Sequence, residues 1–167
     1  AALTIVNDVS ARDIQIPQMQ FYKGKSFRTF GPCGPYLCML EAADTPLIEQ
    51  LDLLLTVNGQ TRQKDNTANL VFKPAETLTE LSGVQDFATG DLIATGTPSG
   101  CALSAPSPRM QKIAALLPEK KKWEIFTKGQ LKRPQYLQPG DKMETSIRTA
   151  DGAIDLGVQR NVIVQGD

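Results

Sequence analysis

The stretch that decides the fold lies at the start of the chain and reads LTIVNDVSARDIQ, residues 3–15. Its first part, residues 3–9, is rich in β-branched side chains and predicts a strand. Ser10, with Asp13 three residues later, predicts a capping box that starts a short helix. Pro17 predicts the end of that helix, because the residue before a proline is pushed out of the α region. The chain is therefore expected to pass from a strand directly into one or two helical turns.

Three polar side chains lie around this joint. Asp8 stands at the end of the predicted strand, while Arg12 and Gln15 are three residues apart and share one face of the helix. A carboxylate, a guanidinium and an amide at a strand end can bind an oxygen-rich ligand together. On spacing alone, an Asp8–Arg12 ion pair with Gln15 in solvent is the more common arrangement. Both interpretations stay open at this point.

Length, charge and cysteine content exclude several classes of protein. A chain of 167 residues fits one domain with a sizeable core. Its 18 basic and 18 acidic residues balance, which gives no overall reason to bind nucleic acid or a membrane. No apolar run approaches the ~20 residues of a membrane span, and no signal peptide is recognisable. Three cysteines without C-x-x-C spacing indicate reduced thiols and a cytoplasmic location.

Histidine is absent from the sequence. The chain alone therefore cannot form a Ser-His-Asp triad, a Cys-His dyad or an imidazole-ligated zinc site. Acid–base chemistry would have to use carboxylates, lysine or metal-bound water.

The remaining sequence predicts mostly short strands joined by glycine turns, with few helices, so an α+β fold that is mainly β is expected. Asn58-Gly59 between two strand-like runs is a strong hairpin signal, because both turn positions need positive φ. Pro74 is predicted to begin a helix that ends near Gly83. The segments 19–24 and 41–46 are expected to be loops. Strands are predicted at 36–40, 51–57, 60–63, 91–95, 142–149, 153–156 and 158–164.

Residues 102–138 differ in composition from the rest of the chain. They hold eight basic and two acidic side chains, a net charge of about +6, with Trp123, Phe126 and Tyr136 interleaved. One helix is predicted here, ended by Pro118. A nucleic-acid platform is conceivable. A solvated lid or an oligomer contact with basic decoration is the more common outcome, because lysine runs usually stay in water.

The opening stretch resembles the NDxSARDxQ signature of the fumarylacetoacetate hydrolase family. The matching motifs follow in family order over roughly residues 3–100 and resume at 137–141. They are Gly24-Lys25-Ser26-Phe27, Thr29, Gly31-Pro32, Gly34-Pro35, Val57-Asn58-Gly59, Arg62-Gln63, Asn66-Thr67, the run from Gly90 to Gly100 and Leu137-Gln138-Pro139-Gly140-Asp141. The resemblance implies a mixed β-sandwich roll, a single C-terminal-type catalytic domain over residues 1–167 with an insertion at 102–138, and a homodimer.

The resemblance also implies a chemistry. Members cleave a C–C bond in small 2-oxo or 1,3-dicarbonyl acids such as acylpyruvates, as in aromatic catabolism, or they decarboxylate or isomerise such acids. Mg²⁺ or Mn²⁺, with Ca²⁺ as a further possibility, acts as Lewis acid. By motif, Asp8 matches a metal ligand, and Lys25 matches the lysine beside the substrate carbonyl. Arg12, Gln15 and Thr97 match catalytic residues that bind and position the substrate; Thr29 is a weaker match.

One family feature is missing from this sequence. The family has a Glu-x-Glu pair of metal ligands and a His-Glu lid before its signature, and neither occurs here. The expectation is a C-terminal portion of a longer protein, with an incomplete metal site and no activity by itself. Two other classes stay open: a catalytically incomplete chain that acts only in assembly, and a binding module built on the basic insert.

Overall fold

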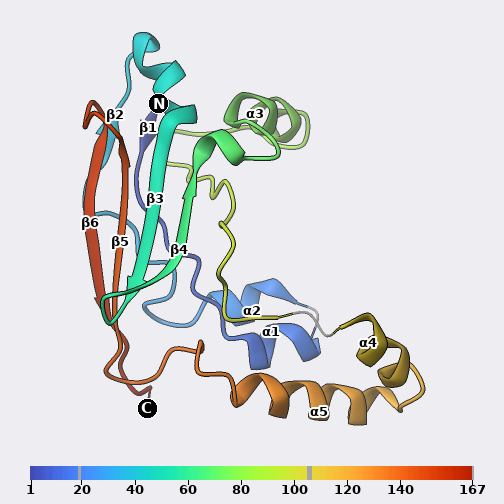
Figure 1. The fold of residues 1–167 in the computed structure, drawn as a ribbon. Coiled ribbons are helices and arrows are strands. Elements are labelled where there is room, and N and C mark those ends of the chain that lie inside the picture. Colours follow the sequence, from blue (N-terminus) through green and yellow to red (C-terminus); the bar gives the residue numbers. More distant parts are fainter. Residues whose placement is uncertain (19, 105–106, 167) are drawn as a thin grey trace.

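The computed structural model describes residues 1–18, 20–104 and 107–166. Four antiparallel strands stand side by side in the order β4-β3-β5-β6, with short helices at both ends of the sheet (Figure 1). The strands of this sheet are β3 (Leu51–Val57), β4 (Gln60–Asn66), β5 (Lys142–Thr149) and β6 (Asp155–Val162). A mainly β, α+β fold is confirmed.

The β3–β4 hairpin forms where the sequence predicts it. Asn58 and Gly59 have φ values of 52° and 77°, the positive values that a tight turn requires. The Asn58 side chain also joins the turn to β5. Its Nδ2 donates to Asp141 Oδ1 at 2.8 Å, and its Oδ1 accepts from the Lys142 amide at 2.9 Å. The hairpin is thereby fixed to the strand beside it, although these two segments are far apart in sequence.

The N-terminal segment forms less strand than predicted. A small second sheet pairs β1 (Ala2–Leu3) with β2 (Cys38–Met39), and Val6 makes only an isolated bridge to Cys33. The predicted strands at 3–9 and 36–40 are therefore wrong in extent. Backbone hydrogen bonds still join the two segments, from the Gly34 amide to the Ile5 carbonyl at 3.0 Å and from the Asn7 amide to the Pro32 carbonyl at 3.1 Å. The buried Gln159 on β6 adds to them, because its Nε2 donates to the carbonyls of Ile5, Pro32 and Gly34 at 3.4, 3.1 and 3.0 Å.

The buried core lies where this N-terminal segment crosses the four-stranded sheet. Ile5, Leu51, Ile154 and Leu156 form one cluster, each at most 3% exposed. Val57 and Met143 are buried nearer the other end of the sheet. Every buried hydrophobic side chain identified in the described part of the chain comes from the N-terminal segment, the sheet or the β5–β6 turn, so the 102–138 insert supplies none of them.

Helices account for the rest of the regular structure. They are α1 (Arg12–Gln18), α2 (Phe21–Lys25), α3 (Pro74–Ser82), α4 (Pro108–Ala114) and α5 (Glu119–Leu131), with 3₁₀ helices η1 (Ala42–Gln50) and η2 (Thr67–Asn69). Helix α3 starts at Pro74 and is capped by Gly83, as predicted. The insert holds two helices where one was predicted. The strand predicted at 91–95 is absent from the described structure, and β6 is continuous where two strands were expected.

Several local expectations around α1 are also wrong. The Ser10 hydroxyl donates to the Asp8 carbonyl, and the Ala11 carbonyl accepts from the amides of Ile14 and Gln15, so the helix begins without the Ser10 box. Pro17 lies inside the helix. Because it falls in the last turn, its missing N–H removes a hydrogen bond without ending the helix before it. The expected loops at 19–24 and 41–46 are wrong in part, because α2 and η1 overlap them and extend to Lys25 and Gln50. Residue 19 lies outside the described residues.

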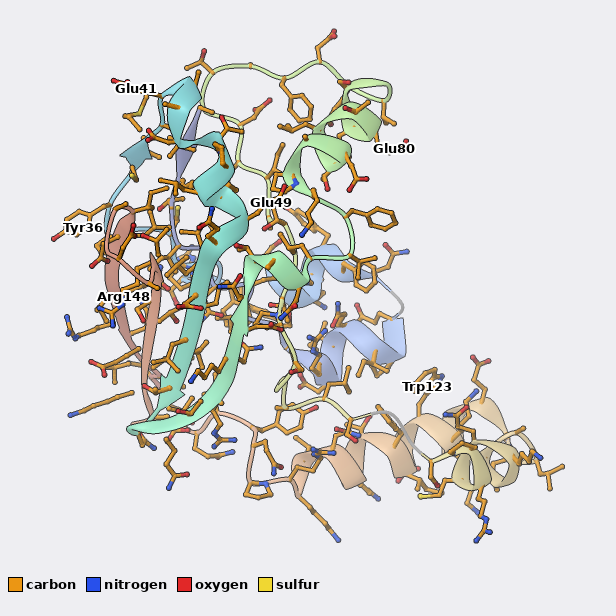
Figure 2. All side chains as sticks on the ribbon, turned by 45° about the horizontal axis from the view of Figure 1, so that its top comes forward. Tyr36, Glu41, Glu49, Glu80, Trp123 and Arg148 are labelled. Atoms are coloured by element: carbon orange, nitrogen blue, oxygen red, sulfur yellow. The ribbon has the colours of Figure 1, made fainter. Side chains whose placement is uncertain are left out.

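The insert helices lie beside α1 rather than against the sheet. Figure 1 shows α5 passing below α1, with α4 at its far end. In Figure 2, Trp123 on α5 and Arg148 on β5 lie on opposite sides of the molecule. Within the described residues, no helix has the length and apolar character needed to cross a membrane.

Candidate active site

Asp8 and Lys25 meet although they are 17 residues apart in sequence. Lys25 Nζ both donates to Asp8 Oδ2 and forms an ion pair with it. The two side chains are 28% and 45% exposed, for the lysine and the aspartate respectively, so the pair remains open to solvent on one side. A compact ammonium is thereby held beside a carboxylate where the N-terminal segment enters α1.

Arg12 and Gln15 form the second polar pair. An Arg12 guanidinium N–H donates to Gln15 Oε1, and Gln15 is 4% exposed. The Asp8–Arg12 ion pair considered from spacing is therefore not the observed arrangement, because Asp8 pairs with Lys25 instead. Burial fixes the orientation of the Gln15 amide, and the amide in turn orients the guanidinium. The expectation that Arg12 and Gln15 share a helix face is confirmed.

Close packing of α2 against α1 holds these pairs together. The Ala11 amide donates to the Gly24 carbonyl at 2.8 Å. A Cβ added at Gly24 would lie 2.7 Å from Cβ of Gln15, a distance that real Cβ atoms essentially never show. Glycine at this position therefore lets Lys25 approach the signature segment, which explains why Gly24 precedes the lysine.

A cleft of about 380 Å³ opens beside these residues. Its polar edge includes Asn7, Asp8, Arg12 and Arg62. The Nδ2 atom of Asn7 is buried and has no hydrogen-bond partner within the described structure. Among the described residues neither Arg12 nor Arg62 forms a close ion pair, although Arg62 acts electrostatically on Asp141, and the charge of Asp8 is balanced by Lys25. The cleft therefore carries excess positive charge and suits an anion.

The remainder of the cleft is mostly apolar. One side is formed by the sheet and the chain end that follows it, through Leu55, Val57, Met143 and Ile163. The insert forms another side. Its contributing residues are Ala102, Leu103, Gln135, Tyr136 and Leu137, from both ends of the 102–138 segment. A ligand with a carboxylate at one end and a small apolar group at the other matches this distribution of side chains.

The loop at residues 96–100 packs against β4. Gln63 Nε2 donates to the Pro98 carbonyl at 3.2 Å. Gly100 has a φ of +106°, and a Cβ there would lie 2.0 Å from the Arg62 carbonyl oxygen. Only glycine allows this approach. Thr97, in the same loop, is exposed and does not line the cleft. Thr29 is exposed as well, with a φ of 70°. The structure thus pairs Asp8 with Lys25 and Arg12 with Gln15. Of the six predicted site residues, Asp8 and Arg12 line the cleft, whereas Lys25, Gln15, Thr97 and Thr29 are not among its lining residues.

The metal-binding capacity of the described residues is limited. Asp8 is the one carboxylate among those that line the cleft. Across residues 1–18, 20–104 and 107–166, no group of three or more Cys, Asp or Glu side chains could hold a metal ion. A hard divalent cation takes about six or more oxygen ligands. The donors present do not fit a complete site.

Two cleft residues were missed by the sequence analysis as site residues. Arg62 appears there only as part of a motif, and Tyr136 only as one aromatic of the insert. Burial raises the pKa of the Tyr136 phenol, and the positive charges of Arg12 and Arg133 lower it in part. The phenol therefore stays protonated at neutral pH. The available signal was weak, because an aromatic residue in a basic segment is typical of many surfaces.

Sequence comparison relates the whole chain to one family. Residues 1–164 match the profile described as fumarylacetoacetate (FAA) hydrolase C-terminal. An uncharacterised protein of Archaeoglobus fulgidus is 42% identical over 100 residues, which cover 60% of this chain and 38% of that protein. The match to a second relative, from Burkholderia lata, covers 42% of that relative's length. The chain thus spans less than half the length of the curated relatives it matches.

Structure comparison gives the same fold. The fumarylacetoacetate hydrolase of Exiguobacterium antarcticum matches with a TM-score of 0.69 and 30% identity, over 98% of this chain and 46% of that one. The 5-carboxymethyl-2-hydroxymuconate delta-isomerase of Mycobacterium smegmatis matches with a TM-score of 0.66 and 27% identity, over 98% and 48%. The expected roll of β-structure with short helices is confirmed.

Proposed function

This chain belongs to the fumarylacetoacetate hydrolase family, and we propose that it forms the part of an active site that hydrolyses a C–C bond in a small 2-oxo or 1,3-dicarbonyl acid of the acylpyruvate type. The observation that carries the proposal is one cationic cleft with apolar sides that Asp8 and Arg12 line, with Lys25 paired to Asp8 and Gln15 paired to Arg12. Such a cleft suits a small anionic substrate with an apolar acyl end.

The proposed roles follow from the chemistry of the reaction. Water adds to the acyl carbonyl, and the C–C bond breaks with its electron pair passing to the 2-oxo group as an enolate. Protonation of that enolate releases pyruvate. The Arg12 fork, oriented by Gln15, binds the substrate carboxylate. Lys25 stabilises the developing enolate oxygen through its fixed ammonium. Thr97 belongs to the proposal as a further ligand of the substrate, supported by its motif alone.

A divalent cation is part of the proposal, as Mg²⁺ or Mn²⁺ with Ca²⁺ as a further candidate. When bound, the ion would supply Lewis-acid stabilisation of oxygen anions. Asp8 would be its ligand from this chain. Because the described donors do not complete a site, we assign no step of the reaction to the ion.

Replacement of Lys25 tests the proposal. In the full-length protein, Lys25→Ala should lower kcat on an acylpyruvate by roughly a hundredfold or more, since removal of one such stabilising donor often costs ~3–4 kcal/mol. Lys25→Arg should not restore the rate, because a planar fork cannot replace a compact point charge. Lys64→Ala, which removes an exposed lysine on β4, is the matched control. Near-normal turnover of Lys25→Ala would contradict the assignment of this site.

Isomerisation is the second candidate, favoured by one observation. The solved structure from Mycobacterium smegmatis is named as an isomerase, and its fold matches over 98% of this chain. Both reactions pass through an enolate that the same cations would stabilise. Product analysis separates them, because hydrolysis consumes water and yields two acids, whereas isomerisation returns one compound of unchanged mass.

We also propose that the protein forms a homodimer. The described chain has an accessible surface of 12056 Å². A compact monomer of 18.2 kDa would expose only about 8,100 Å². Part of the excess is apolar: Tyr36, Leu37 and Met39 are 62%, 67% and 69% exposed around β2. Sedimentation velocity on the full-length protein should show a dimer at micromolar concentration; a monomer throughout would contradict this.

A further inference from the structure

A second, smaller cavity lies directly behind the cleft. It has a volume of about 110 Å³, is partly open, and is lined by residues of α1 and α5. The larger cleft and this rear cavity share three lining residues, namely Ser10, Arg12 and Tyr136. These residues therefore form the partition between the two spaces. Tyr136 supplies the only aromatic ring of that partition.

The rear cavity has an apolar part and a polar part, and the polar part includes Asp13 and Gln130. Ile16 of α1 faces Phe126 and Leu131 of α5 across it, and Thr127 completes the helical side. Nothing in the proposed reaction uses this space. The apolar part, next to a cationic cleft, is suited to the hydrocarbon end of a carboxylic acid, because burial of each methylene is favourable.

Tyr136 is held in place by a chain of hydrogen bonds. Its hydroxyl donates to Gln130 Oε1 at 3.2 Å, and Gln130 Nε2 donates to the Ser104 carbonyl at 3.0 Å. The ring is thus fixed between α5 and the first residues of the insert. A ring held on two sides makes a defined wall rather than a freely turning side chain.

We infer that Tyr136 sets the length of the acyl chain that the cleft accepts, and that the rear cavity is an apolar subsite which its ring closes off. The inference rests on the proposed function, since it concerns the acyl end of the same substrate. The cleft that Arg12 lines is also lined by Leu103, Tyr136 and Leu137 of the insert, which would contact the acyl chain of a substrate bound there. Removal of the ring would join the two spaces and admit a longer chain.

Binding of straight-chain 2-oxo acids of increasing length tests the inference without requiring turnover. Calorimetry on the full-length protein with Mg²⁺ should give an affinity that rises about fourfold per methylene until the cleft is full, then falls. In Tyr136→Ala the optimum should move to a longer acid. An acid two methylenes beyond the wild-type optimum should bind at least about tenfold more tightly to this variant than to the wild type.

Matched variants separate the ring from its hydroxyl. Tyr136→Phe keeps the wall and should keep the wild-type optimum. Thr127→Phe, added to Tyr136→Ala, refills the rear cavity and should return the optimum to the shorter acid. Leu116→Ala, at an insert position that is 87% exposed and lines neither space, should change nothing. If Tyr136→Ala does not fold, Tyr136→Trp should move the optimum to a shorter acid.

Three results would overturn the inference: an unchanged optimum in the folded Tyr136→Ala or Tyr136→Trp variant, an equal shift in Tyr136→Phe, or a wild type that binds none of the acids. The proposed function fails separately. If the protein does not cleave acylpyruvates but the preferred acid length shifts in the variants as expected, only the proposed reaction is contradicted. If it cleaves acylpyruvates normally but the preferred acid length is the same in the Tyr136 variants, only the role of Tyr136 is contradicted.

Discussion

The four-stranded sheet and the 102–138 insert differ in what they bury. Strands β3, β5 and β6 bring Leu51, Met143 and Leu156 into the core at 1–4% exposure. The insert places no described side chain in that core, yet its two ends line the cleft, and its helix α5 lines the rear cavity. Stability is therefore expected to depend on the sheet, and selectivity for the ligand on the insert. Substitutions that separate these two properties test the comparison.

The largest stability effect is expected in the core. Leu156→Ala removes a side chain that is 1% exposed and packs with Ile5 and Ile154. Because a cavity remains, the free energy of unfolding should fall by about 2–5 kcal/mol. Chemical denaturation measures this change. Leu116→Ala in the insert is the matched control and should stay within about 0.5 kcal/mol of the wild type. Equal losses in both variants would show that the insert carries as much stability as the sheet.

Removal of the insert should have a smaller effect on stability. A short Gly/Ser linker in place of residues 104–136 shortens a surface connection, and each halving of loop length changes closure entropy by only about 0.6 kcal/mol. We expect cooperative thermal unfolding to persist, while the length selectivity for 2-oxo acids disappears with Tyr136. Loss of cooperative unfolding would place the insert in the core and remove the contrast between the two regions.

The smallest effect is expected at Asp141, which directly precedes β5 and accepts a hydrogen bond from Asn58 in the β3–β4 turn. The Gln138 amide and the Asn58 side chain, both hydrogen-bonded to Asp141, lower the pKa of its carboxyl below the ordinary value of 3.8. A carboxyl whose pKa is lower in the folded state than in the unfolded state makes its full contribution to stability at pH values above the ordinary pKa. That contribution is lost as the pH falls through the pKa of the folded state.

Melting curves at several pH values measure this contribution. The Tm difference between wild type and Asp141→Asn should be constant above about pH 4 and should shrink as pH falls below the ordinary value of 3.8. Because the carboxyl is exposed, a difference below about 4 °C is expected. Asn58→Ala removes one of the two hydrogen bonds and should reproduce part of the effect. A Tm difference that grows toward low pH would contradict the direction assigned to this pKa.

Local sequence signals predicted those parts of the fold that local geometry controls. Asn58-Gly59 specified the hairpin because few residue pairs accept positive φ at both positions, and Pro74 began α3 because its fixed φ and missing N–H suit the first helical position. Gly83 caps α3 with φ −74°, so no positive φ is required there. The alternation in β5 predicted its full length. Arg12 and Gln15 were placed on one helix face by the helical period alone. The family resemblance drew attention to Asp8 and Lys25 as well, without indicating that they pair.

Tertiary packing decided what local signals could not. The segment at 3–9 has strand-like composition, but it pairs with the chain around Cys33 and Cys38 only through short stretches, and Gln159, more than 150 residues later, adds a side-chain hydrogen bond to the Ile5 carbonyl. Asp8 pairs with Lys25 rather than with Arg12 because α2 packs against α1 at Gly24. Helical spacing along the sequence does not predict this tertiary contact. Likewise, Tyr136 lines the cleft because its hydroxyl is hydrogen-bonded to Gln130 of α5, and α5 lies beside α1. The sequence alone determined turns, periodicity and family, since these depend on neighbouring residues. The pairing of charges and the shape of the cleft arise from contacts between distant segments, which only the folded chain brings together.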